Sequence, residues 1–218
     1  MMHWKSPSLK IAVRPSALSR AQLKEVKDLL LEIDPSLSID EHFVETAGDR
    51  DKITSLRHAP DDFFTQDLDA YILSCHADCA VHSLKDLPPR LHPLLELAAI
   101  TKGKSSRDLL LFKGTQLLSR GYIATSSPRR EENVKSVLPH AIFFDLRGTI
   151  EERLQFLEKE DIDGIVMAEA ALQRLRLDLP HFVLPGETAK GQGKLALVIR
   201  KGESNLKNLL QCLHYTSV

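Results

Sequence analysis

The sequence predicts an α/β protein built from two similar units, each with a mostly parallel sheet. Short apolar runs typical of buried strands alternate with segments whose apolar residues recur every three or four positions, as on one helix face. The alternation starts again after residues 102–106, which have the composition of a linker. A chain of 218 residues with 43% hydrophobic residues can bury the two cores that this architecture requires.

The first unit begins with an apolar strand at residues 9–14. Leu23, Val26, Leu30 and Ile33 then share one face of a helix, which ends at Asp34-Pro35. The remaining elements that we expect in this unit are a strand at 38–46, a helix around 64–72 and a strand at 79–83.

The second unit repeats the pattern. Its helices are expected at 128–138 and 150–158, and the latter opens with the capping box Thr149-Ile-Glu-Glu152. A further strand at 195–200 precedes a helix striped with leucines from Leu206 to Leu213. The strands expected inside the unit are 109–112, 122–125, 141–145 and 164–167. Two such units would leave a cleft between them as the natural ligand site.

Composition excludes several classes of protein. The 29 basic and 30 acidic residues give a net charge of -1, so nothing attracts the chain as a whole to nucleic acid or an anionic membrane. No apolar stretch approaches the roughly 18 residues of a membrane span, and the first ten residues lack a signal-peptide core. Three cysteines without a disulfide spacing fit a reducing compartment, so we expect a cytoplasmic protein.

The strongest candidate for chemistry is the string Val81-His-Ser-Leu-Lys-Asp-Leu-Pro88. It places Lys85 and Asp86 at the end of a buried strand, where open α/β sheets bind ligands. Asp86 can then act as a proton acceptor and donor, or as the counter-charge of a cationic intermediate. The competing interpretation is a solvated ion pair in a turn.

A second cluster, Thr125-Ser126-Ser127-Pro-Arg129-Arg130, combines hydroxyls with two guanidiniums. Ser127 is a good N-cap and Pro128 suits the first helical position, which places both arginines in the first turn. Together with free backbone N–H groups they predict a site for carboxylates or phosphates. Alternatively, both arginines point into solvent.

Further anion contacts are expected at three places. Arg147, Gly148 and Arg153 surround another helix start, where Arg153 either binds a second carboxylate or pairs with Glu151 or Glu152. Arg14 and Ser16 end the first strand. Finally, Gly191-Gln192-Gly193 either lines the cleft or is a flexible crossover. An arginine-lined cleft with a catalytic carboxylate suits a substrate that carries several carboxylates.

With these motifs in order, the chain resembles the porphobilinogen deaminase (hydroxymethylbilane synthase) family from about Leu9 to its end. The motifs that carry the resemblance are Ala12-Val-Arg-Pro-Ser16, Thr46-Ala-Gly-Asp49, His82-Ser-Leu-Lys-Asp-Leu-Pro88, Thr125-Ser-Ser-Pro-Arg-Arg130, Leu146-Arg-Gly148 with Arg153, Met167-Ala168 and Gly191-Gln-Gly193.

The resemblance implies two domains like those of periplasmic binding proteins, at 1–100 with 195–218 and at 105–190, in a monomer. It implies a transferase that condenses four porphobilinogens head-to-tail to hydroxymethylbilane with release of ammonia. Asp86 would be the catalytic carboxylate. Acetate and propionate groups of porphobilinogen and of the pyrrole oligomers would be bound by Arg14, Ser16, Lys85, Thr125, Ser126, Ser127, Arg129, Arg130, Arg147, Gly148, Arg153, Arg174 and Gln192. For Arg174 the alternative is a solvated helix face.

Two departures from the family pattern stand out. The family anchors a dipyrromethane cofactor on a cysteine of a third domain, which we expect to be absent here, and no matching cysteine loop occurs. Cys75 and Cys79 are expected in the core and Cys212 on the last helix, and no metal-ligand spacing is present. In addition, Asp61 stands where the family has a lysine.

Three functions therefore compete. The first is a minimal porphobilinogen deaminase. The second is a non-catalytic binding protein for a tetrapyrrole precursor or other polycarboxylate. The third is a regulatory ligand-binding domain of the same architecture, although no DNA-binding helix-turn-helix is evident.

Overall fold

The structure, a computed structural model, describes residues 8–113 and 121–215. The chain divides into two compact units. Unit 1 comprises Met1–Arg50, Asp61–Gly103 and Lys194–Val218, and unit 2 comprises Asp51–Pro60 and Lys104–Gly193. Residues 51–60 therefore belong to the second unit. The sequence had placed them in the first unit, within residues 1–100.

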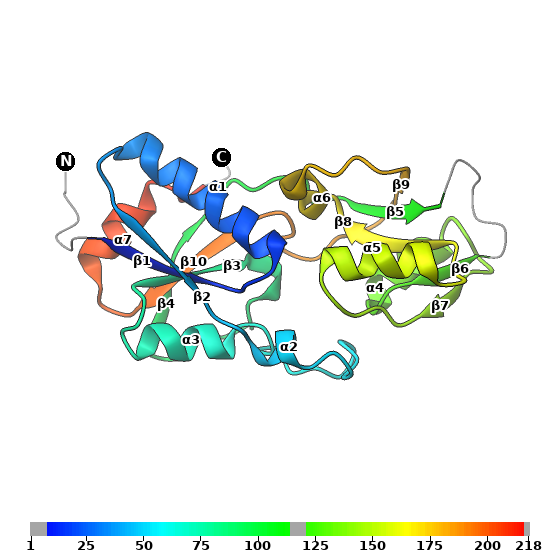
Figure 1. The fold of residues 1–218 in the computed structure, drawn as a ribbon, viewed down its shortest axis with the longest axis horizontal. Coiled ribbons are helices and arrows are strands. Elements are labelled where there is room, and N and C mark those ends of the chain that lie inside the picture. The colour runs from blue at the N-terminus through cyan, green and yellow to red at the C-terminus, as the bar shows by residue number, and fades with distance from the viewer. Residues whose placement is uncertain (1–7, 114–120, 216–218) are drawn as a thin grey trace. The chain divides into compact units, whose positions relative to one another are not determined.

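Unit 1 is built on a five-stranded mixed sheet with the order β2-β1-β3-β10-β4 (Figure 1). Its strands are β1 (Leu9–Val13), β2 (Ile39–Phe43), β3 (Cys79–Ser83), β4 (Leu95–Ile100) and β10 (Leu195–Arg200). β1 runs parallel to β2 and β3, whereas β10 is antiparallel to both of its neighbours. One reversed strand in an otherwise parallel arrangement confirms the expected mixed sheet.

Helices cover both faces of this sheet. The helical segments of unit 1 are α1 (Ala17–Ile33), α2 (Ala47–Arg50), α3 (Gln66–Leu73), the 3-10 turn η1 (Leu84–Asp86) and α7 (Ser204–Gln211). Leu23 of α1 and Leu206 of α7 belong to one apolar cluster, and Leu68 of α3 belongs to another. Along β3 the clusters alternate, with Val81 in the first and Ala80 in the second, as the pleat of a strand requires.

Unit 2 repeats the plan with the order β7-β6-β8-β5-β9. Its strands are β5 (Asp108–Phe112), β6 (Tyr122–Ala124), β7 (Ile142–Phe144), β8 (Gly164–Ala168) and β9 (His181–Val183). β6 is parallel to β7 and β8, and the reversed strand β5 is again the fourth of five. Both sheets therefore have the same arrangement, with one reversed strand in the fourth position.

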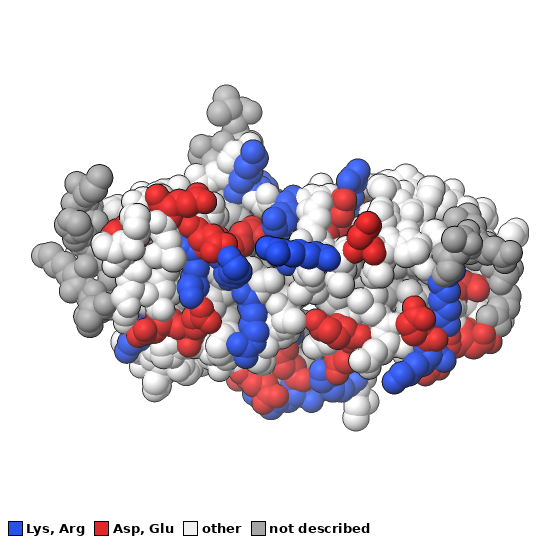
Figure 2. All heavy atoms as spheres, turned by 45° about the horizontal axis from the view of Figure 1, so that its top comes forward, with Lys and Arg blue, Asp and Glu red and all other residues white. Residues whose placement is uncertain are grey.

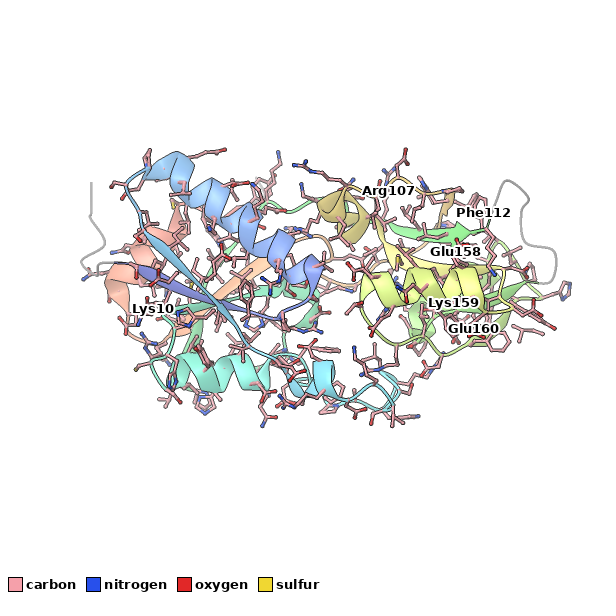
Figure 3. The ribbon with its side chains drawn as sticks, viewed as in Figure 1. Lys10, Arg107, Phe112, Glu158, Lys159 and Glu160 are labelled. Carbon is pink, nitrogen blue, oxygen red and sulfur yellow. The ribbon has the colours of Figure 1, made fainter. Side chains whose placement is uncertain are left out.

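Three helices pack on the sheet of unit 2: α4 (Pro128–Lys135), α5 (Ile150–Lys159) and α6 (Glu169–Leu175). Ser127 caps α4 with Pro128 at its first position, and the Thr149 capping box opens α5, as the sequence predicted. At the far end of α5, Figure 3 shows Glu158, Lys159 and Glu160 together near its last turn.

The structure corrects several expectations. The sequence did not predict β4, β9 or α6, and β2 ends at Phe43 instead of continuing to Thr46. Cys79 is buried as expected, but Cys75 is exposed, because it follows α3 in a left-handed turn with φ of 59°.

No helix of the described residues is long and apolar enough to cross a membrane. Figure 2 shows basic and acidic side chains interspersed, in keeping with the near-zero net charge.

Candidate functional site

Asp86 lies directly beyond the carboxyl end of β3, in the 3-10 turn η1. Its side chain is 38% exposed, and its carboxylate lies 3.9 Å from the Lys85 ammonium. Lys194, the residue before β10, holds one side of this turn, because its carbonyl accepts from the Leu84 N–H at 3.0 Å. Asp86 is therefore an accessible carboxylate on a fixed strand end, as the sequence predicted.

A small polar pocket of about 20 Å³ adjoins Asp86 within unit 1. It is lined by Arg14, Ser19, Gln22, Phe64, Thr65, Leu68, Val81, His82, Ser83 and Asp86. Gln22, which belongs to none of the sequence motifs, donates from Nε2 to Ser83 Oγ at 2.8 Å. A signal for it existed, since Ser19 and Gln22 continue the buried stripe of α1 with polar residues.

Arg14 is held by a carboxylate of its own unit. Its Nε lies 3.1 Å from both oxygens of Asp49, and its guanidinium lies 4.2 Å from the centre of the Phe64 ring. Asp49 also accepts from the backbone and hydroxyl of Thr46 at 3.0 and 2.8 Å. Burial raises the pKa of Asp49, but Arg14 and Thr46 outweigh this and lower it, so the Asp49 carboxyl is ionised near neutral pH. Arg14 is thereby fixed at the edge of the pocket.

Ser16 and Asp61 have simpler environments. Ser16 is the N-cap of α1, and its hydroxyl accepts from the Ser19 N–H at 3.2 Å. Asp61, the replacement in the family pattern, is exposed.

In unit 2 the hydroxyls of the second cluster shape their own loop. Ser126 Oγ donates to the Leu146 carbonyl at 2.7 Å and accepts from the Leu146 N–H at 2.9 Å. Thr125 Oγ1 accepts from the Ser127 N–H at 3.3 Å. The two bonds of Ser126 join the loops that follow β6 and β7, just before α4 begins.

Both arginines of this cluster bind Asp108, a carboxylate with no exposed surface. Arg130 donates from Nη2 at 2.7 Å and from Nε at 3.1 Å, and Arg129 donates from Nη1 at 2.8 Å. Gln192 Nε2 is the third partner, at 2.9 Å. Burial raises the pKa of Asp108, but Arg130 and Arg129 outweigh it and lower the pKa. Both guanidiniums therefore bind an internal carboxylate, and Arg130, 8% exposed, does not point into solvent.

The third cluster surrounds the start of α5. Gly148 has a φ of 98°, and its carbonyl accepts from Arg153 Nε at 2.9 Å. Glu152 is engaged by the Thr149 N–H at 2.6 Å and by Lys52 at 3.1 Å. Arg153 thus contacts the backbone of Gly148, while Glu152 has partners of its own.

The segment 51–60 packs on this part of unit 2. Arg147 Nη2 donates to the Asp51 carbonyl, and Arg57 Nη2 donates to the Thr125 carbonyl at 3.2 Å. Arg57 also pairs with Glu131 of α4. These contacts bring Arg147 and Thr125 next to one segment, although neither sequence motif indicated this.

The Gly191-Gln192-Gly193 motif is an ordered connection. Gln192 is buried, and its Nε2 also donates to the carbonyl of Ser106 at 2.7 Å. The Gly193 carbonyl accepts from Arg174 Nη2 at 2.8 Å and from the Lys104 N–H at 3.0 Å. Arg174 therefore anchors this connection to α6 and is more than a solvated helix residue. Figure 3 shows Arg107, which pairs with Glu169 of α6 at 2.6 Å, beside the same helix.

Gly193→Ala is expected to destabilise the protein more than Gly202→Ala. Both glycines have positive φ, 84° and 91°, so alanine at either should cost about 1–2 kcal/mol in backbone strain. Only at Gly193 would the new methyl lie 2.5 Å from the Ser105 carbonyl oxygen, whereas nothing lies within 4 Å at Gly202. We expect a further loss of about 2 kcal/mol at Gly193, measured by urea unfolding. Equal losses would show that the connection yields to the added methyl.

The two mixed five-stranded sheets define a two-unit α/β fold of the periplasmic-binding-protein type. The VFT2 domain of BvgS from Bordetella pertussis matches 97% of this chain and 88% of its own, with a TM-score of 0.54 at 14% identity. A substrate-binding protein of an amino acid ABC transporter from Streptococcus pneumoniae covers 94% of this chain and 86% of its own, with a TM-score of 0.52 at 16% identity. These likenesses establish the fold alone.

Sequence comparison is more specific. The family profile described as "Porphobilinogen deaminase, dipyromethane cofactor binding domain" matches residues 9–208. A porphobilinogen deaminase of Syntrophomonas wolfei is 34% identical over 220 residues, which cover 95% of this chain and 71% of the relative. A probable porphobilinogen deaminase of Chlamydia muridarum is 40% identical over 195 residues, or 87% of this chain and 80% of the relative. This chain belongs to the porphobilinogen deaminase family.

Proposed function

We propose that this protein condenses porphobilinogen head-to-tail into hydroxymethylbilane, with Asp86 as its catalytic carboxylate. The observation that carries the proposal is the placement of Asp86, which is accessible at the end of β3 beside Lys85 and a polar pocket. Family membership supplies the substrate class.

The chemistry requires an anion near the reacting ring. When the C–N bond of the protonated aminomethyl group breaks, its electron pair leaves with ammonia and the positive charge stays on the pyrrole. Asp86 is assigned to accept a hydrogen bond from the pyrrole N–H and to stabilise this cation until a ring carbon of a second pyrrole attacks it and then loses its proton. Electrostatic stabilisation of this kind is worth about 10²- to 10³-fold in rate.

Each unit carries donors that suit acetate and propionate groups. In unit 1 these are Lys85 and Arg14, and in unit 2 they lie at the starts of α4 and α5. Arg129 keeps 29% of its side chain exposed, whereas the buried Arg130 is assigned to hold Asp108 and the helix start. The assigned donors of unit 2 are Thr125, Ser126, Ser127, Arg129, Arg147 and Arg153.

A dipyrromethane cofactor carries the same carboxylates as the substrate, so the same donors fit it. When bound, it supplies the terminal pyrrole carbon to which the first substrate is joined. Among the described residues Cys75 and Cys212 are exposed thiols. Intact-mass spectrometry of the denatured protein distinguishes a covalently bound dipyrrole from one that is lost on denaturation.

The described residues contain no group of three or more potential metal ligands.

Incubation with porphobilinogen tests the proposed function. We expect the purified protein to consume porphobilinogen and to form a product that is converted to uroporphyrin on oxidation. Binding of porphobilinogen, seen by calorimetry, without consumption would replace this proposal with the binding protein considered above.

A further inference from the structure

His82 is a buried histidine to which the proposed chemistry assigns no task. It is the penultimate residue of β3 and is only 5% exposed. Its Nε2 is fully buried and has no hydrogen-bond partner among the described residues. Such an atom costs roughly 1–3 kcal/mol unless a ligand or an ordered water satisfies it.

The pocket beside Asp86 can supply that partner. His82 and Asp86 line the same cavity of about 20 Å³, which suits one water molecule, since a water needs about 10–15 Å³ by this measure. A buried water also needs two to four polar neighbours. Ser19, Gln22 and Ser83 complete a polar lining, so a single water here can bridge the imidazole and the carboxylate.

Burial keeps His82 neutral, and the two charges of the pocket act on it in opposite directions. Arg14, from the end of β1, and Asp86, from η1, are the charged side chains of the lining, while α1 and α3 contribute uncharged ones. Burial lowers the pKa of His82 to about 4; Asp86 opposes the shift and Arg14 adds to it. Near pH 7 the ring is therefore an uncharged imidazole that donates one hydrogen bond and accepts one.

We propose that His82 is a positioning residue that orients the Asp86 carboxylate through one water molecule in this pocket. The inference rests on the proposed function, because that function gives Asp86 its task. His82 itself does not contact substrate in this arrangement. It limits the rotation of a carboxylate that is otherwise 38% exposed and has Lys85 at 3.9 Å as its ion-pair partner.

Two substitutions separate positioning from packing. His82→Leu fills the site but makes no hydrogen bond, and we expect kcat to fall about 100-fold with KM within about twofold, as a misplaced catalytic group would give. His82→Gln keeps a hydrogen-bonding group and is expected to stay within about tenfold of the unsubstituted protein. A folded His82→Leu protein with unchanged kcat, or equal losses in both variants, would overturn the inference.

Nitrogen-15 NMR of the histidine rings tests the coupling without turnover. Asp86→Asn is expected to shift the ring resonances of His82, whereas Asp40→Asn, an exposed partner of Ser8 on β2, should leave them in place. If the ring resonances of His82 do not shift in Asp86→Asn, the inference is refuted even in an active protein. Failure of the unsubstituted protein to consume porphobilinogen would instead refute the proposed function, so the two failures are distinguishable.

Discussion

Asp86→Asn is expected to reduce the consumption of porphobilinogen by about 10³-fold or more while leaving the fold intact. The substitution keeps the shape of the side chain and removes the charge that stabilises the cation and accepts protons, effects worth about 10²- to 10⁴-fold each. Stability should change by less than about 1 kcal/mol, because the pair with Lys85 is partly exposed and 3.9 Å long. Turnover is measured by loss of porphobilinogen, and stability by urea unfolding.

Asp40→Asn is a matched control, since it removes an equivalent charge from an exposed position in the same unit. It should retain the turnover of the unsubstituted protein. An Asp86→Asn protein that is as active as this control would remove Asp86 from the mechanism.

Asp108→Asn is expected to destabilise unit 2 by about 3–5 kcal/mol. The carboxylate is fully buried and neutralises Arg130 and Arg129, so its loss leaves guanidinium charge without compensation in a poorly hydrated site. Asparagine preserves the volume, which separates the charge effect from a cavity. The measurement is the free energy of unfolding in urea, followed by a probe in unit 2.

The control for this experiment is Asp28→Asn, which breaks an exposed i,i+4 pair with Lys24 and should cost only about 0.3–0.5 kcal/mol. The pH dependence gives an independent check. The pKa of Asp108 is lowered below 3.8 in the folded protein, so its contribution is complete above that value and is lost as pH falls through the folded pKa. The difference in unfolding free energy between the unsubstituted protein and Asp108→Asn should therefore narrow in strong acid. A difference that stays constant with pH would contradict the ion-pair account.

Most of the fold could be predicted because it follows from apolar periodicity and capping residues. β3 and β10 have the bounds that the sequence predicted, and both are nearly fully buried. The missed elements lack such signals. β9 has three exposed residues, β4 contains the helix formers Leu, Glu and Ala, and α6 has no side-chain N-cap.

The candidate site was predicted less completely, because its contacts join distant parts of the chain. The sequence identified Arg129, Arg130 and Gln192 but not Asp108, which lies 21, 22 and 84 residues from them. Likewise, Arg14 was expected to bind ligand carboxylates, and its bond to Asp49 depends on the fold. A local motif indicates which residues carry charge, whereas the tertiary structure decides which charges are already paired.

In the proposed reaction this protein releases ammonia from porphobilinogen as it joins the rings, and Asp86 stabilises the cation that forms. The most direct test measures ammonia and hydroxymethylbilane in the same reaction. The account predicts four molecules of ammonia for each tetrapyrrole from the unsubstituted protein, and neither product above background from Asp86→Asn. Binding of porphobilinogen without release of ammonia, or ammonia release that persists in Asp86→Asn, would contradict it.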